Sequence, residues 1–232
     1  MIFMIYITGD THGLFDLDKI INYFKNKNVS KIDYLIILGD VAVCFHGGQK
    51  DERVRKTLQN LPITVLFIDG NHDHHQQLAS YPVCDWNGGK VHFIEEDNIH
   101  LMRGYVFHKE GHTFFTFGGA SSVDRAWRTE GIDWWPEELP SIEERERGLM
   151  ELDKVNNEVD YILTHTAPYH VAALKHKEIW KKEIEFRYYL QQIADTVKFK
   201  KWFFGHFHED RNILNRFIGL YNGVYELIEN TD

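Results

Sequence analysis

Acidic, amide and imidazole side chains recur at the ends of short apolar segments. Asp10 and His12 follow the apolar residues 1–8, and Asp40 follows residues 34–39. Carboxylate and imidazole together are typical ligands of manganese, iron or zinc, and the absence of cysteine at these positions argues against a structural zinc site. Two ions sharing a bridging carboxylate can bind a phosphoryl oxygen and supply a hydroxide nucleophile. Further residues of this kind are Asn71, His72, Asp73, His165, His206 and His208.

The apolar segments that precede these residues are predicted to be β-strands. They are short, rich in β-branched and aromatic residues, and not strictly alternating, as expected of strands covered on both faces. In an open, mainly parallel sheet, ligand sites lie beyond the carboxyl ends of the strands. We therefore expect these side chains to converge on one sheet edge. The segments are residues 1–8, 34–39, 63–70, 161–165 and 201–206.

Helical and strand signals alternate irregularly between these segments. A helix is predicted over residues 17–24 with Asp16 as N-cap, and another begins at Ser141, where "SIEE" matches a capping box. Mixed order of this kind indicates an α/β fold in which two packed sheets have helices outside. The remaining predicted helices span 49–60 and 179–197, and further strands are expected at 91–94, 104–108, 112–119 and 217–228.

Length and composition indicate one domain over residues 1–232, with 43% hydrophobic residues. No window approaches the roughly 20 apolar residues of a membrane span, and the first run lacks a signal peptide's basic leader. The two cysteines, Cys44 and Cys84, suit a reducing compartment, so we expect a cytoplasmic protein without a disulfide framework. The net charge of −9 argues against long nucleic acid as a partner.

Residues 120–141 form the longest segment without clear periodicity. Loops of this length inside a compact domain are usually functional or disordered, and the three tryptophans here argue against disorder. We expect this loop to form a wall of the site. Arg125 and Arg128 are candidate phosphate ligands, and Trp127 is a candidate stacking surface for a base or ring. Alternatively, the arginines pair with the loop's own glutamates.

The motifs "GDTHG", "GDV", "GNHD", "THTAP" and "GHFH", spanning residues 9–208, resemble the calcineurin-like metallophosphoesterase superfamily, especially its small bacterial and phage-type members. The resemblance implies a four-layer α/β/β/α sandwich of two mixed sheets flanked by helices. It also implies one metal held by Asp10, His12, Asp40 and His208. Asp40 would bridge to a second metal, completed by Asn71, His165 and His206.

The resemblance further implies hydrolysis of a phosphate monoester or diester by a metal-bridging hydroxide. His72 would donate a proton to the leaving oxygen and Asp73 would orient it, although a structural role for either is the alternative. The expected substrate is a small phosphate ester or nucleotide, and the expected cofactors are two divalent ions, manganese first and iron or zinc otherwise. A nuclease acting on nucleic-acid ends is an alternative. A non-catalytic scaffold is less favoured, because every ligand position is filled.

Overall fold

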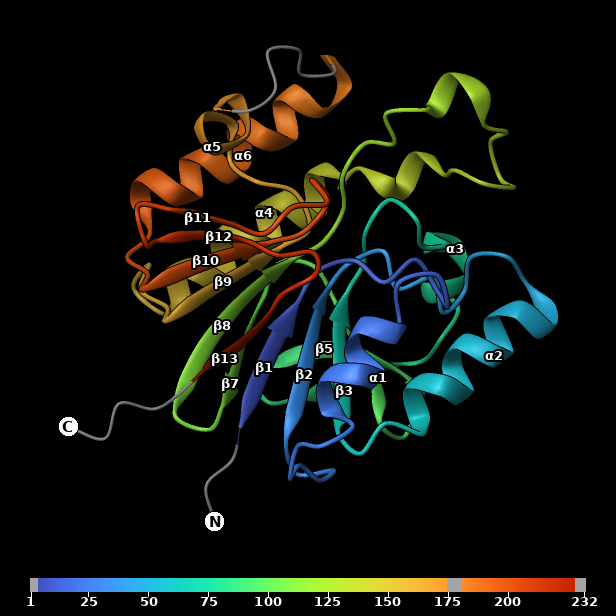
Figure 1. Cartoon of the computed structure of the whole chain (residues 1–232). Helices are drawn as coiled ribbons and strands as arrows, with labels where there is room; N and C mark the ends of the chain where they lie inside the picture. The colour runs from blue at the N-terminus through green and yellow to red at the C-terminus, as the bar shows by residue number, and fades with distance from the viewer. Residues whose placement is uncertain (1–3, 175–180, 228–232) are drawn as a thin grey trace.

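The computed structural model describes residues 4–174 and 181–227, which fold into two β-sheets packed face to face (Figure 1). The first sheet has the order β13-β1-β2-β3-β6-β5-β4. Its centre, from β1 to β6, is parallel, and the other strands pair antiparallel. The strands are β1 (Ile5–Thr8), β2 (Tyr34–Leu38), β3 (Thr64–Ile68), β4 (Val83–Trp86), β5 (Gly89–Glu95), β6 (Asn98–Leu101) and β13 (Val224–Leu227).

The second sheet has the order β11-β12-β10-β9-β8-β7 and is also mixed. Strands β8, β9, β10 and β12 run parallel, while β7 and β11 pair antiparallel at the two edges. The bounds are β7 (Tyr105–Lys109), β8 (His112–Phe117), β9 (Tyr161–Thr164), β10 (Lys201–Phe204), β11 (Arg211–Ile213) and β12 (Phe217–Gly219).

Helices cover the outer face of each sheet, as Figure 1 shows. Helices α1 (Asp18–Phe24) and α2 (Gly48–Gln59) pack on the first sheet, and α4 (Ile142–Lys154), α5 (Tyr169–Ala173) and α6 (Lys181–Thr196) pack on the second. The short helix α3 (His75–Leu78) follows β3. The segment 120–141 contains two 3-10 turns, η1 (Arg125–Trp127) and η2 (Pro136–Glu138).

Alternate residues of the central strands of the first sheet pack into two different cores, one under the helices and one between the sheets. In β1, Tyr6 packs toward α1, whereas Ile5 and Ile7 pack between the sheets. In β2, Leu35 and Ile37 face the helices, while Ile36 and Leu38 face the second sheet. The expectation of strands covered on both faces is therefore confirmed, as is the four-layer sandwich.

Local differences from the expected elements have physical causes. The capping box at Ser141 and Glu144 is present at the start of α4. Asp16 does not cap α1; its carboxylate contacts His12 instead, and α1 begins at Asp18 without a side-chain cap. The segment expected as one strand over 217–228 divides into β12 and β13, which belong to different sheets. Residues 1–3, 179–180 and 228 of the expected elements lie outside the described residues.

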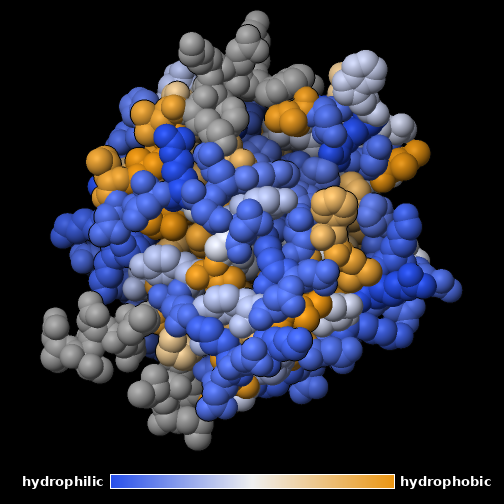
Figure 2. Space-filling model, in the orientation of Figure 1, coloured by the Kyte–Doolittle hydropathy of each residue, from blue (hydrophilic) through white to orange (hydrophobic). Residues whose placement is uncertain are grey.

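Hydrophilic side chains cover most of the face in Figure 2, where apolar side chains gather in small groups. Among the described residues, no helix is long and apolar enough to cross a membrane. Two aromatic side chains stand out as almost fully exposed: Phe15 at 87% and Trp127 at 91%. An exposed large aromatic group is informative when it borders a functional cavity.

Candidate metal centre

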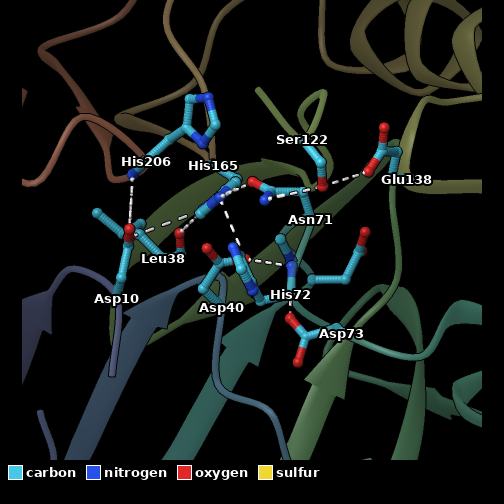
Figure 3. Close-up of polar contacts among 12 residues, drawn as sticks. Asp10, Leu38, Asp40, Asn71, His72, Asp73, Ser122, Glu138, His165 and His206 are labelled. Atoms are coloured by element: carbon cyan, nitrogen blue, oxygen red, sulfur yellow. Dashed lines mark hydrogen bonds and ion pairs between the residues drawn. The ribbon is translucent and has the colours of Figure 1, made fainter. Parts of the chain in front are cut away.

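Five loops, each following the carboxyl end of a strand, meet at one edge of the paired sheets (Figure 3). The loops after β1, β2 and β10 bring ligand atoms of four residues within 4.8 Å of one another, namely Asp10, His12, Asp40 and His208. His12 Nε2 lies 3.5 Å from Asp40 Oδ2, and His208 Nε2 lies 3.2 Å from Asp10 Oδ2. Because these donors come from distant parts of the chain, only the fold brings them together.

A second group of donors lies on the other side of Asp40. His165 Nε2 is 3.4 Å from Asp40 Oδ1 and 3.1 Å from Asn71 Oδ1. Asp40 thus turns one carboxylate oxygen to His12 and the other to His165, an orientation that allows it to bridge two ions. The ring of His206 lies beside that of His165, with centroids 5.0 Å apart, and its backbone N–H donates to Asp10.

The spacing of these donors fits metal coordination. Two atoms bound to one ion at about 2.1 Å and at right angles lie about 3 Å apart, close to the separations seen here. Two imidazoles also have their far nitrogens fixed: His165 Nδ1 donates to Leu38 O at 2.6 Å, and His12 Nδ1 lies 2.7 Å from Asp16 Oδ2. Such bonds orient a histidine so that its Nε2 faces the ion. These residues therefore fit a pair of divalent metal ions.

The electrostatics of the site favour bound cations. Asp10 and Asp40 are both buried. Burial is the largest effect and acts to raise the pKa of each carboxyl, but His165 and the other neighbouring histidines together outweigh it, and the net pKa is lowered. For His165, burial acts to lower the pKa, yet Asp40 and Asp10 raise it to about 10. Two buried carboxylates without compensating positive charge are costly, and metal ions supply that charge.

The loops that carry the candidate metal ligands have backbone conformations that are uncommon for residues other than glycine. Four candidate ligands have positive φ: 45° at His12, 52° at Asp40, 66° at His206 and 51° at His208. Such conformations cost on the order of 1–3 kcal/mol each and cluster at functional sites. Gly70 allows the close approach of two loops, since a Cβ there would lie 2.1 Å from Asp40 Oδ1.

His72 lies beside the donors in an open cavity of about 730 Å³. Its backbone N–H donates to Asp40 Oδ1 at 2.7 Å, and its Nε2 accepts a hydrogen bond from Arg128 Nη2 at 3.1 Å. Burial lowers the pKa of His72, and Arg128 and His12 add to the effect. Because Nε2 accepts from Arg128, it carries no proton in this arrangement, and both residues line the cavity.

Asp73 lies behind the cavity rather than in its wall. Its fully buried carboxylate accepts hydrogen bonds from the backbone N–H groups of Gly70 and Ala42, both at 2.8 Å. Burial, with Asp40 nearby, raises the pKa of Asp73 to about 6. These contacts tie the loop after β3 to the loop after β2, so Asp73 acts on the site through the position of those loops.

The three loop residues expected to contact substrate have different placements. Arg128 lines the cavity and is paired with Asp124 at 2.7 Å. The guanidinium of Arg125 lies 3.5 Å over the ring of Trp134 and 3.7 Å from the buried Glu138, and Arg125 is not among the cavity-lining residues. Trp127 is 91% exposed and does not line the cavity either. Substrate contact by Arg125 and Trp127 stays a prediction.

Three polar residues that the sequence motifs did not indicate support the site. Asn71 Nδ2 donates to Ser122 Oγ at 3.3 Å, and Ser122 Oγ donates to Glu138 Oε2 at 2.7 Å, as Figure 3 shows. These two hydrogen bonds orient the Asn71 amide so that its Oδ1 faces His165. Arg187 of α6 also lines the cavity, with its Nη2 bonded to Glu183 at 2.8 Å. None of these residues belongs to a strand-end motif, so only tertiary structure reveals them.

The chain belongs to the calcineurin-like phosphoesterase family, whose sequence profile matches residues 3–210. This family is metal-dependent, and the cluster of Asp10, His12, Asp40 and His208 could hold a metal ion. Its curated relatives include lariat debranching enzymes of Danio rerio, 24% identical, and of Schizosaccharomyces pombe, 22% identical. Each alignment covers 87% of this chain but only 39% and 47%, respectively, of those relatives.

Solved structures share the fold at low sequence identity. The protein TT1561 of Thermus thermophilus aligns with a TM-score of 0.55 and 13% identity, covering 94% of this chain and 89% of that one. A putative 5'-nucleotidase from Staphylococcus aureus aligns with a TM-score of 0.51 and 14% identity, covering 97% of this chain and 50% of that one. These similarities support the same sandwich architecture.

Proposed function

We propose that this protein is a phosphodiesterase that uses two divalent ions, bridged by Asp40, to hydrolyse a nucleotide-type phosphate ester. The observation that carries the proposal is the position of the Asp40 carboxylate, which lies between the His12 and His165 imidazoles. Asp10, His12 and His208 would complete one ion's ligand set, and Asn71, His165 and His206 the other's. Manganese is our first choice, since all donors are oxygen or nitrogen; iron or zinc would fit the same set.

When bound, such a metal pair supplies a water-derived nucleophile and neutralises charge on the phosphoryl group. The chain's own residues do the rest. A phosphate entering the cavity would accept hydrogen bonds from the N–H groups of Arg128. The hydrogen bond from Arg128 to His72 Nε2 would then be broken. His72 would then take up a proton from solvent at the freed Nε2 and donate it to the leaving oxygen, while Asp73 holds the loop that carries His72.

A diester substrate is favoured over a monoester. The curated relatives include lariat debranching enzymes, and debranching a lariat breaks a phosphodiester. The cavity has open space around the donors, as a phosphate with two substituents requires.

The chain's two cysteines are both free, which supports a cytoplasmic location.

The decisive experiment compares Mn²⁺-dependent hydrolysis of bis(p-nitrophenyl) phosphate with that of p-nitrophenyl phosphate. We expect the diester to be preferred, and an Asp40→Asn variant to lose turnover together with bound metal. Metal content is measured on the same preparations. A clear preference for the monoester would overturn the diester assignment, and wild-type protein that binds manganese without turning over either compound would overturn the enzymatic proposal.

A further inference from the structure

A second open cavity of about 640 Å³ adjoins the metal centre. His12, Phe15 and His72 line both this cavity and the metal-site cavity, so the two hollows adjoin across these side chains. We call the second one the side cavity. Its other lining residues are Gly13, Leu14, Ala42, Phe45, His46, Lys50, Arg53 and Val54.

The side cavity offers flat apolar surfaces beside the reacting centre. Phe15 stands on the ridge between the two hollows and is 87% exposed. The ring of Phe45 also lines the side cavity and lies 5.5 Å from that of His72. Exposed aromatic rings next to a phosphate site can stack on nucleobases, because every base presents a π-face.

The charge of the side cavity is opposite to that of the whole chain. Lys50 and Arg53, on the first turns of α2, line it, and no carboxylate is among its lining residues. Neither cation has an ion-pair or side-chain hydrogen-bond partner among residues 4–174 and 181–227. In a protein of net charge −9, two unpaired cations on an apolar cavity indicate an anionic ligand group.

We propose that the side cavity binds the leaving-group side of an oligonucleotide, with a base against Phe15 and Phe45 and the next phosphate between Lys50 and Arg53. The inference rests on the proposed function, because it places the scissile phosphate at the metal donors. His72 borders both hollows, so a leaving oxygen within its reach belongs to the group that extends into the side cavity. A short single-stranded oligonucleotide can occupy this site, so binding it does not need a long basic groove.

The test measures kcat/KM for a thymidine trinucleotide relative to bis(p-nitrophenyl) phosphate, which has no second phosphate to contact Lys50 and Arg53. We expect this ratio to fall about tenfold in Phe15→Ala and in the double variant Lys50→Ala with Arg53→Ala. Lys56→Ala is the matched control, because Lys56 lies on the same helix but pairs with Glu52 away from the cavity. An equal ratio in all variants would overturn the proposal.

An equilibrium measurement separates this inference from the catalytic one. Fluorescence anisotropy follows binding of a labelled phosphorothioate trinucleotide between about 50 mM and about 200 mM salt. We expect the log–log salt slope to decrease by about 0.7 for each phosphate that the double variant no longer neutralises, with Lys56→Ala matching the wild type. If this pattern appears without any turnover, the side-cavity proposal is supported and the proposed activity is refuted. If turnover is robust but the Trp127→Ala variant alone loses binding, the strand lies along the other wall and the side-cavity proposal fails.

Discussion

Replacing Ser122 by alanine should weaken one metal ion of the pair more than the other. The Ser122 hydroxyl lies between Asn71 Nδ2, at 3.3 Å, and Glu138 Oε2, at 2.7 Å. All three side chains are buried, with exposures of 3% or less. Removal of the hydroxyl leaves an amide N–H and a carboxyl oxygen without partners, which costs about 1–3 kcal/mol.

That energy sets the size of the effect on metal affinity. A cost of about 1.4–2.7 kcal/mol corresponds to a 10- to 100-fold change, the range found when groups behind a metal ligand are mutated. The loss should fall on the ion that Asn71 would hold, because the proposed ligands of the other ion do not contact Ser122. We therefore expect one of two manganese affinities to fall by about 10- to 100-fold.

A manganese titration followed by electron paramagnetic resonance can resolve the two affinities. Ser121→Ala is the matched control: Ser121 is the adjacent serine and equally buried, and its side chain bonds to no other described residue. Affinities within twofold of wild type in Ser122→Ala would refute the reasoning. So would an equal loss at both ions, because that result would indicate general disruption of the fold.

Three other substitutions test separate features. Arg128→Ala should raise KM for phosphate esters about tenfold or more while metal content is retained, as steady-state kinetics with metal analysis will show; unchanged KM would remove Arg128 from substrate binding. Gly70→Ala should destabilise the fold by about 1–3 kcal/mol in urea unfolding, because its Cβ would lie 2.1 Å from Asp40 Oδ1; wild-type stability would contradict this contact. Burial, with His100 nearby, lowers the pKa of His92 to about 4, so the unfolded chain binds the extra proton and stability falls as the pH drops from about 6.5 toward 4. His92→Gln should reduce this slope by up to about 1.4 kcal/mol per pH unit and exposed His108→Gln should not; equal slopes in urea unfolding would refute the assignment.

The strand-end residues could be predicted because their positions follow from a simple rule of sheet geometry. Asp10, Asp40 and His165 each follow a short apolar segment, and parallel strands carry such residues to one edge. Ser122 and Glu138 gave no such signal, because their effect on Asn71 depends on how a long loop folds back.

Topology beyond the central strands was harder to predict. The segment 217–228 has a continuous strand pattern, yet its two halves join different sheets. The β-propensity of the segment cannot specify that change of partner, because the strand that each half pairs with is decided by the tertiary structure. The edge strands β4 and β11 carried no clear apolar pattern, because edge positions are only partly buried.

The carboxylate of Asp10 accepts the backbone N–H of His206, a contact between residues 196 positions apart. A chain emerging from the ribosome therefore carries its first metal donor long before it carries the last. The amino-terminal half alone lacks His165, His206 and His208, so it cannot close the metal shell whatever native structure it forms. Under the proposed function, uptake of the metal pair would therefore report that synthesis has passed residue 208 and that these loops have come together, and a cleavage before residue 206 would release the ions even from a chain whose parallel strands β1, β2, β3 and β6 remained paired.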